Sequence, residues 1–330
     1  MSETIDFVLP WVNDQDPFWS KKRAQYKSNE GDNVHPARYR DWDLLKFLFR
    51  GIERFTPWVH KIWFVSDHQQ PSWLNTENEK IRIVQQEDLL DSKNQPTFNI
   101  NAIELNLHRI QGLSQTFVYL NDDMFFLRPI SPSVFFRNGL PCDSAILSPV
   151  IVTRKIDVGS IAINDMCLIN TNFNKSLVIR ENPSKWLNLC YGKHLLRTIC
   201  LMPWRHFPGF FNPHLPQPYL KATFERVWQV EPERLAEVSG HRFRNFYSDV
   251  NQWLIRYWQL CSGDFAPTSP NRGRDLSVMS IESTVRAVEK QMYDFVCIND
   301  DERIDDIYPY KKALINAFEN ILPEKSGYEK

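Results

Sequence analysis

The sequence predicts an α/β fold: a mostly parallel β-sheet with helices on both faces, plus an inserted helical lobe. Short apolar runs rich in strand-forming residues alternate with stretches whose apolar residues recur at helical spacing. Four of these runs end in polar, mostly acidic clusters, at residues 13–16, 66–68, 85–88 and 121–123. Because parallel strands end at one edge of their sheet, we expect the clusters to gather along one rim, where open α/β sheets bind ligands.

Composition excludes several classes of protein. The 330 residues are 42% hydrophobic and 13% aromatic, which supports a large core and excludes disorder. The net charge of −1 and the absence of a basic stripe disfavour nucleic-acid binding. The six cysteines lack CxxC spacing, and the N-terminus lacks a signal-peptide pattern, so we expect reduced thiols in a cytoplasmic protein. No apolar run reaches the roughly 18 residues of a transmembrane helix. The sequence leaves peripheral contact with the inner face of the plasma membrane, and the oligomeric state, open.

The first part of the chain supplies the predicted parallel strands, at residues 5–12, 62–65, 81–84 and 117–120. Between the first two we expect a short helix and loop within 18–37, then a helix from an N-cap at Asp41 to Phe55. Apolar residues of that second helix recur every 3.6 positions, and Thr56-Pro57 ends it. A further helix is expected over 99–110, carrying Glu104 and Arg109.

The pattern changes near residue 130. Short apolar pieces at 131–150 precede a mainly helical stretch at 160–262, which a proline-dense segment interrupts, and then a linker-like loop at 263–276. A helix over 280–291, a strand over 295–298 and a helix over 305–322 close the chain. We therefore expect three parts: an α/β core at 1–150, a helical insertion at 151–276, and a return to the core at 277–330.

One stretch, TFVYLNDDMFFLRP at Thr116–Pro129, carries the chemistry. A buried strand that ends in Asn121, Asp122 and Asp123 is costly unless these side chains are satisfied, and oxygen ligands of this kind suit Mg²⁺ or Mn²⁺. Alone, the triplet is equally typical of a capped turn. The same strand-then-NDD pattern returns before Asp300. We therefore expect Asn121, Asp122, Asp123 and Asp300 to bind the metal, with a base role for Asp123 as the alternative.

These pieces resemble the Stealth family of bacterial sugar-1-phosphate transferases, relatives of the lysosomal-enzyme GlcNAc-1-phosphotransferase. The family has four characteristic regions. Here they correspond to Ile5–Pro17 with the run WVNDQDP, Arg40–Arg128 with the run HRIQGLSQTFVYLNDDMFF, the stretch from Asn212 to Arg244, and Cys297–Asp301. The second region is the most specific. Pro10 and Gln15 depart from the residues usual in the family, which bears on nucleotide contacts but removes no acid.

The resemblance implies a GT-A-like nucleotide-sugar fold with a helical lobe. It implies that a sugar 1-phosphate, such as HexNAc-1-phosphate, passes from a UDP-sugar to a glycan hydroxyl with release of UMP. The acceptor would be a polysaccharide or a lipid-linked oligosaccharide, and the product a capsular polysaccharide or exopolysaccharide. By family match, Glu104 and Asp123 belong to the active site, and the helical lobe contributes His214 and Arg244.

Attack on a pyrophosphate phosphorus requires charge neutralisation, a base near the hydroxyl, and cationic clamps for the phosphates. His214 is the candidate base or phosphate contact, and the candidate phosphate clamps and nucleotide-pocket residues are Arg109, Arg128, Arg244, Trp11, Asn13 and Asp16. Each has an ordinary alternative: core packing for a tryptophan or a loop histidine, a surface ion pair for an arginine, and an i,i+4 helix partner for Glu104.

Two other functions share most of these features. A metal-dependent glycosyltransferase would use the same strand-then-acid device, attack the sugar carbon and release UDP. A non-catalytic protein that binds a sugar nucleotide or a glycan has little need for several acids beside a phosphate, so the two NDD motifs speak against it.

Overall fold

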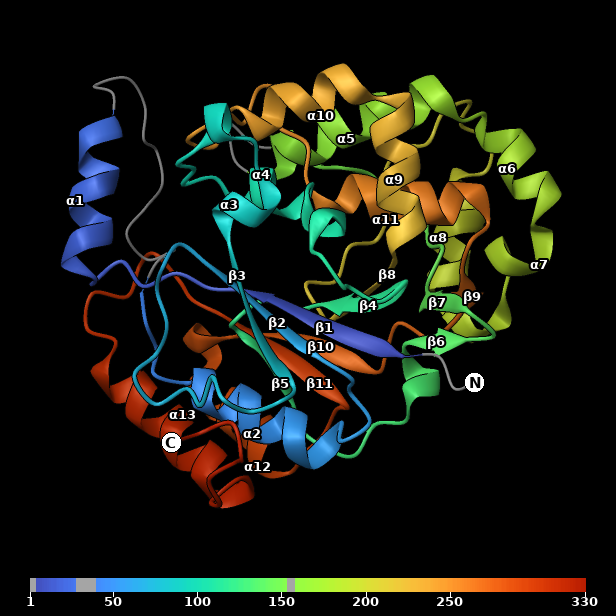
Figure 1. The fold of residues 1–330 in the computed structure, drawn as a ribbon. Helices are drawn as coiled ribbons and strands as arrows, with labels where there is room; N and C mark the ends of the chain where they lie inside the picture. The colour runs from blue at the N-terminus through green and yellow to red at the C-terminus, as the bar shows by residue number, and fades with distance from the viewer. Residues whose placement is uncertain (1–3, 28–39, 153–157) are drawn as a thin grey trace.

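The computed structural model describes residues 4–27, 40–152 and 158–330. These residues form a five-stranded sheet of order β3-β2-β1-β4-β8 (Figure 1). Its parallel strands are β1 (Ile5–Pro10), β2 (Ile62–Ser66), β3 (Ile81–Gln85) and β4 (Thr116–Tyr119). The edge strand β8 (Gln217–Leu220) runs antiparallel to β4. The predicted mostly parallel α/β sheet is confirmed.

Strand β1 organises the sheet because it lies at its centre and is buried along its whole length. Its side chains alternate between two cores: Phe7 and Leu9 pack on one face, and Val8 packs on the other. The exception is Asp6, which is fully buried and accepts hydrogen bonds from the Trp63 indole and the Ser114 backbone. The chain leaves β1 toward β2 on one side, and β4 occupies the other side, which creates a topological switch point.

Helices cover both faces of the sheet. One core contains residues of α2 (Leu45–Phe55), α12 (Ile281–Glu289) and α13 (Tyr308–Ile321), together with a small sheet of order β10-β11-β5. The strands of that small sheet are β5 (Met124–Phe126), β10 (Gly273–Ser277) and β11 (Phe295–Asn299). On the other face lies the helical lobe, which in Figure 1 sits above the sheet. Its helices are α5 (Val158–Asn172), α6 (Lys175–Glu181), α7 (Pro183–Trp186), α8 (His194–Leu201), α9 (Lys221–Val230), α10 (Pro232–Ser239) and α11 (Gln252–Ser262).

The lobe and the sheet share a core. Val8, Trp63 and Phe117 of the sheet pack in the same cluster as residues of the lobe helices. The predicted insertion at 151–276 also supplies the edge strand β8 and most of β10. The remaining elements are α1 (Pro17–Tyr26), α3 (Gln86–Leu89), β6 (Phe136–Arg137), β7 (Leu140–Asp143) and β9 (Ala266–Pro267). None of the described helices is long and apolar enough to cross a membrane.

Three local predictions were wrong. The helix predicted over 99–110 is split into α4 (Ile100–Glu104) and a 3₁₀ turn at Leu107–Arg109. Asp41 does not cap α2: its side chain accepts a hydrogen bond from the backbone of Asp43, 2.7 Å away, and the helix starts only at Leu45. The loop predicted at 263–276 contains most of β10, because pairing with the buried strand β11 outweighs the weak local preference of GRDLS. The part of the predicted 18–37 helix and loop that falls at 28–39 lies outside the described residues.

A buried ion pair connects the lobe to β7. Both side-chain oxygens of Asp143 accept hydrogen bonds of 2.8 Å from Arg256 on α11. A second arm of the same guanidinium donates to the Phe211 carbonyl and to the Asn212 side chain. Charges removed from water need such complete pairing, so this contact fixes the segment that leads to residue 214.

We predict that Asp143→Asn lowers the free energy of unfolding by about 3–5 kcal/mol, because it leaves the buried guanidinium without its counter-charge. Urea denaturation monitored by circular dichroism measures the change. The matched control is Glu237→Gln, which removes an exposed pair with Arg234 and should cost less than about 1 kcal/mol. Equal costs for the two variants would contradict the prediction.

Candidate active site

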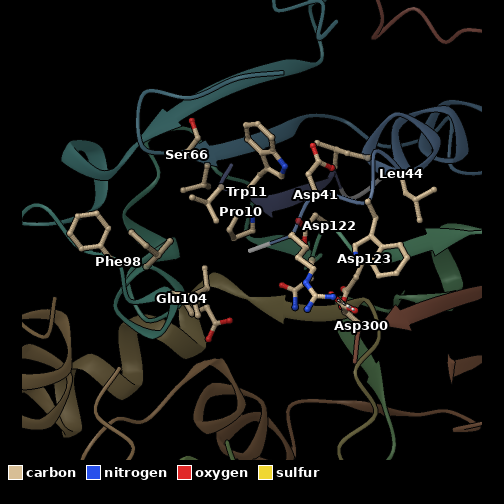
Figure 2. Close-up of a pocket in the computed structure, with 18 of the residues that line it drawn as sticks. Pro10, Trp11, Asp41, Leu44, Ser66, Phe98, Glu104, Asp122, Asp123 and Asp300 are labelled. Atoms are coloured by element: carbon tan, nitrogen blue, oxygen red, sulfur yellow. Dashed lines mark ion pairs between the residues drawn. The ribbon is translucent and has the colours of Figure 1, made fainter. Parts of the chain in front are cut away.

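A cavity of about 540 Å³ opens at the carboxyl ends of β1, β2 and β4 (Figure 2). It therefore lies at the switch point, where α/β sheets bind ligands. Polar and aromatic residues from distant parts of the sequence line the cavity: Trp11, Arg40, Asp41, Ser66, Asp67, Asn99, Glu104, Asn121, Asp122, Asp123, His214, Arg244, Asn299 and Asp300. The predicted gathering is confirmed for three of the four strand-end clusters, because residues of 66–68, 85–88 and 121–123 line the cavity. It is wrong for 13–16: after β1 the lining residues are Trp11 and Val12.

The two NDD motifs meet in this cavity. Asn121 to Asp123 join β4 to β5, and β5 pairs with β11, which runs directly into Asn299 and Asp300. The backbone N–H of Ile298 donates to the carbonyl of Asp123, 2.9 Å away. Asp123 Oδ1 and Asp300 Oδ2 are buried and have no hydrogen-bond partner among the described residues. Unpartnered buried carboxylate oxygens indicate a missing cation or donor.

Asp122 projects into the cavity and is open to it, but protein atoms surround the cavity closely. This enclosure, together with the neighbouring Asp123 carboxylate, raises the pKa of Asp122 to about 7. Acids crowded in this way become fully charged more readily when a cation joins them. Asp122, Asp123 and Asp300 thus form the acidic side of the cavity.

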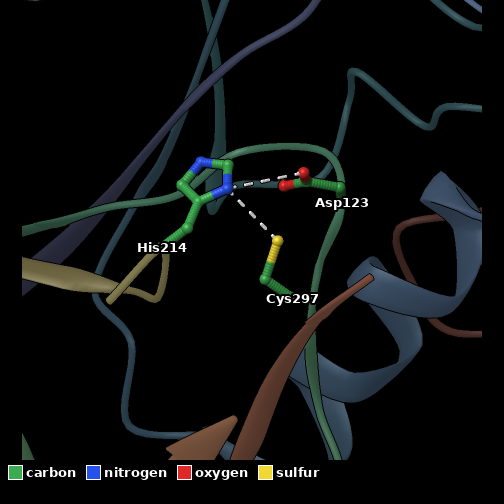
Figure 3. A group of neighbouring side chains, drawn as sticks. All are labelled: Asp123, His214 and Cys297. Carbon is green, nitrogen blue, oxygen red and sulfur yellow. Dashed lines mark hydrogen bonds and ion pairs between the residues drawn. The ribbon is translucent and has the colours of Figure 1, made fainter. Parts of the chain in front are cut away.

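His214 lies beside Asp123 (Figure 3). Its Nε2 lies 2.6 Å from the Asn121 amide nitrogen, which can only donate, so Nε2 is the unprotonated nitrogen. The other nitrogen, Nδ1, lies 3.4 Å from Asn299 Oδ1, 3.8 Å from Asp123 Oδ2 and 3.3 Å from Cys297 Sγ. Asn299 Oδ1 can only accept, so the proton of the neutral ring sits on Nδ1. The NDD motifs therefore fix the tautomer of this histidine.

Glu104 and Arg244 occupy the lobe side of the cavity. Glu104 is buried and accepts hydrogen bonds from the Tyr119 hydroxyl, at 2.7 Å, and from the Gln252 backbone. Burial raises the pKa of Glu104, and the positive charge of Arg244 opposes that shift. Arg242, two residues before Arg244, lies over the Tyr26 ring with its guanidinium carbon 4.5 Å from the ring centroid. Of these two arginines, Arg244 is the one that lines the cavity.

Asp249 holds the loop of Arg244 against α4. This buried carboxylate accepts hydrogen bonds from the side chains of Asn99, Asn101 and His241 and from the Asn245 backbone. The hydrogen bond and the negative charge of Asp249 raise the pKa of His241. One buried charge thus joins helix α4, which carries Glu104, to the loop of the lobe that carries Arg244.

Four predicted substrate-binding residues do not line the cavity. The Asn13 side chain bonds to the Gln15 backbone, and Asp16 caps α1 through the backbones of Phe18 and Trp19. Arg109 lies over the Trp228 ring and 3.6 Å from Asp91. Arg128 pairs with Asp294 at 2.6 Å. Local capping and ion pairing thus hold these four side chains away from the cavity, and their assignment as nucleotide or phosphate contacts stays a prediction that this placement does not favour.

Sequence reasoning missed three residues of this region. Arg40 and Asp41 line the cavity, and an Arg40 nitrogen lies 3.9 Å from Asp300 Oδ1. Burial raises the pKa of Asp41. Cys297 lies within reach of both His214 and Asp123, and burial followed by the Asp123 charge raises the pKa of its thiol. Only the position of Cys297, two residues before Asn299 of the second NDD motif, offered a signal in the sequence.

The comparisons with known proteins agree with this geometry. Residues 38–142 match the profile of Stealth protein CR2, conserved region 2, and residues 3–31 match Stealth protein CR1, conserved region 1. The chain is 40% identical to the capsular polysaccharide phosphotransferase WcwK of Streptococcus pneumoniae, over 99% of this chain and 98% of that protein. The chain belongs to the Stealth family.

Other relatives of this Stealth protein carry similar names. The exopolysaccharide phosphotransferase cps2G of Lactiplantibacillus plantarum is 38% identical over 99% of this chain and 96% of its own. The receptor polysaccharide phosphotransferase WefC of Streptococcus gordonii is 37% identical over 100% of both. The protein is therefore an enzyme of the phosphotransferase class. The first two expected family regions are confirmed, and the regions around His214 and Asp300 stay predictions.

We predict that the thermal stability of this Stealth protein falls as the pH rises through the raised pKa of His241. The pKa is higher in the folded than in the unfolded state, so the stabilisation is complete below the unfolded value of about 6.5 and is lost above the folded value. Thermal unfolding between about pH 6 and pH 9 measures this decline. His241→Gln, which keeps a donor toward Asp249, should show a smaller decline; an equal slope in both proteins would refute the assignment.

Proposed function

We propose that this Stealth protein transfers a sugar 1-phosphate from a UDP-sugar to a hydroxyl of a cell-surface polysaccharide and releases UMP. The observation that carries the proposal is the convergence of two NDD motifs, His214 and two arginines in one cavity at the sheet's switch point. The names of the relatives, phosphotransferases of capsular, exo- and receptor polysaccharides, support a glycan acceptor and a phosphodiester product.

The cavity supplies positive charge for the phosphates. Arg40 and Arg244 are the guanidinium groups on the described part of its wall, and they come from opposite sides, the loop before α2 and the lobe. Planar guanidinium groups bind phosphate oxygens through paired hydrogen bonds. We assign Arg244 and Arg40 as phosphate clamps in place of Arg109 and Arg128, and Trp11 as a wall of the nucleotide site.

The acids fit a hard divalent cation, Mg²⁺ or Mn²⁺. Asp123 and Asp300 each offer a buried oxygen with no partner among the described residues, and Asp122 and Asn121 add further oxygen atoms beside them. When bound, such an ion neutralises the charge that develops on the transferred phosphoryl group. Asp123, His214 and Cys297 also lie close enough together to hold a softer metal, so the role of Cys297 needs its own test.

His214 is the proposed base. Its Nε2 lone pair, which accepts a hydrogen bond from the Asn121 amide, can exchange that donor for the acceptor hydroxyl. In the reaction the hydroxyl oxygen bonds to the β-phosphorus, the bond from that phosphorus to the UMP oxygen breaks, and the hydroxyl proton passes to Nε2. The Nδ1 proton, which faces Asn299 and Asp123, holds the ring in the required tautomer. Asp123 then serves the metal rather than the proton.

We predict that the purified enzyme, given a panel of UDP-sugars, Mg²⁺ and an oligosaccharide acceptor, releases UMP. Chromatography of the released nucleotide identifies the reaction, and EDTA should stop it. Asp123→Asn should lower kcat by about 10²–10⁴-fold, a range typical for a group that acts in the transition state, and should weaken Mn²⁺ binding measured by electron paramagnetic resonance.

The control for this experiment is Cys297→Ser, which should keep both UMP release and Mn²⁺ binding if oxygen atoms hold the metal. Release of UDP would instead identify a glycosyltransferase. Tight UDP-sugar binding with no nucleotide released from any sugar and acceptor pair would favour a non-catalytic binding protein. Either result would overturn the proposal.

We predict that His214→Ala lowers kcat by about 10²–10⁴-fold and changes KM for the UDP-sugar little, because a base acts in the transition state. His214→Gln, which retains a polar contact with the phosphates but takes up no proton, should be equally impaired. Steady-state kinetics of both variants separates the roles of base and phosphate contact. A rise in KM with kcat unchanged would show that His214 only binds phosphate.

A further inference from the structure

An exposed apolar surface lies on the helical lobe, around α8. Leu189, Leu196, Ile199 and Trp204 expose 85%, 66%, 49% and 57% of their surfaces. Single exposed apolar side chains are ordinary, but several within one short segment mark an interaction site. We call these four residues, with Lys193 and Arg197 between them and Arg205 directly after Trp204, the lobe-tip surface. Figure 1 shows α8 at the right of the view, with α1 at the far left.

Helix α8 presents two of its apolar residues, Leu196 and Ile199, to solvent. Its one buried residue is Thr198, whose hydroxyl accepts a hydrogen bond from the Leu147 backbone. Leu195 and Leu201 of α8 pack against the lobe core, so the apolar residues Leu196 and Ile199 lie outside the stripe by which the helix contacts that core. Packing in the protein's own core does not explain why Leu196 and Ile199 are apolar. Contact with an apolar phase outside the protein would explain it.

The surface extends beyond α8. Arg197 donates to the Ser148 hydroxyl at 3.2 Å, and the Val150 backbone bonds to the Pro208 carbonyl, which places the end of that strand-like segment beside the lobe-tip surface. The next residue, Ile151, exposes 80% of its surface. Apolar side chains from two separate parts of the chain thus border one region.

The chain segment that carries this surface has charged residues of one sign. No aspartate or glutamate occurs between Glu181 and Glu225, although the whole chain has a net charge of −1. The same stretch carries exposed Lys193, Arg197 and Arg205 between the apolar side chains. Leucine, isoleucine and tryptophan interleaved with lysine and arginine is the composition of segments that lie in the interface of an anionic bilayer.

We propose that the lobe-tip surface docks the enzyme onto an anionic lipid bilayer. The apolar side chains enter the acyl boundary, and the three basic side chains contact lipid phosphates. A second copy of the chain is a poorer occupant, because pairing about a two-fold axis would bring the same basic residues against each other. A hydrated polyanion is also a poorer occupant, because it offers nothing for the exposed leucines. The inference does not depend on the proposed reaction, since these residues lie outside the cavity lining.

The test is sedimentation of the full-length protein with lipid vesicles. Binding should be strong to vesicles that contain phosphatidylglycerol and weak to vesicles of phosphatidylcholine alone, and it should fall as salt rises. Lys193→Gln with Arg205→Gln should weaken binding about 25-fold, from about 1 kcal/mol for each basic residue near the surface. Leu196→Ser with Trp204→Ser should weaken it by more than about tenfold.

Matched controls come from other exposed positions. Tyr308→Ser replaces a side chain that exposes 67% of its surface on α13, and Lys290→Gln removes an exposed charge after α12. Both should bind vesicles like the unmodified protein. All variants change exposed residues, so each should keep its thermal stability and its activity on a soluble acceptor.

Three results would overturn the inference. The first is no binding to anionic vesicles. The second is equal loss in the control and lobe-tip variants. The third is a concentration-dependent dimer, seen by sedimentation velocity, that Leu196→Ser with Trp204→Ser abolishes; that result would assign the surface to a second copy.

Discussion

The antiparallel pairing of β5 with β11 is the constraint on which the active site depends. β5 begins directly after Asp123, and β11 ends directly before Asp300, so one ladder places both acidic triplets at the same point. The ladder also delivers Cys297 opposite Met124 and thereby sets the surroundings of His214. Carboxylates that are held close together repel one another. This arrangement is stable only because the paired strands that carry them are buried and well packed. A cation is the simplest group that relieves this repulsion.

The lobe's contributions reach the cavity on irregular segments, which need polar partners to hold one conformation. Arg256 and Asp143 fix the approach to His214, and Asp249 fixes the loop of Arg244 against the helix of Glu104. Each of these buried charges joins segments that are distant in sequence. The packing of the lobe and the geometry of the site are therefore coupled. Loss of either hydrogen-bond network should lower activity because it displaces His214 or Arg244, not because it removes a contact with the substrate.

The net charge of the chain conceals two opposite local fields. The cavity gathers acids at the sheet's rim, and the lobe-tip surface carries basic residues with no acid nearby in the sequence. Whole-chain charge argues against a nucleic-acid partner, because such a partner needs a basic stripe. It cannot report a basic patch of three side chains, and screening makes each patch act only over about 10 Å. A nearly neutral protein can thus hold a cation in its acidic cavity and also bind an anionic bilayer through a basic patch.

The sequence by itself determined the four parallel strands and β11, the helical nature of the lobe and the acids of the first NDD motif. These are local properties: apolar runs, helical periodicity and an abrupt change to polar residues. The tertiary structure decided which candidates face the cavity. Arg109, Arg128 and Arg244 were equally good candidates for phosphate clamps in the sequence. In the structure, Trp228 and Asp294 contact the first two, and of the three only Arg244 lines the cavity. Arg40, Cys297 and strand β10 were missed because their roles arise from pairing across the chain, and a long-range contact leaves no periodic signal in the residues that make it.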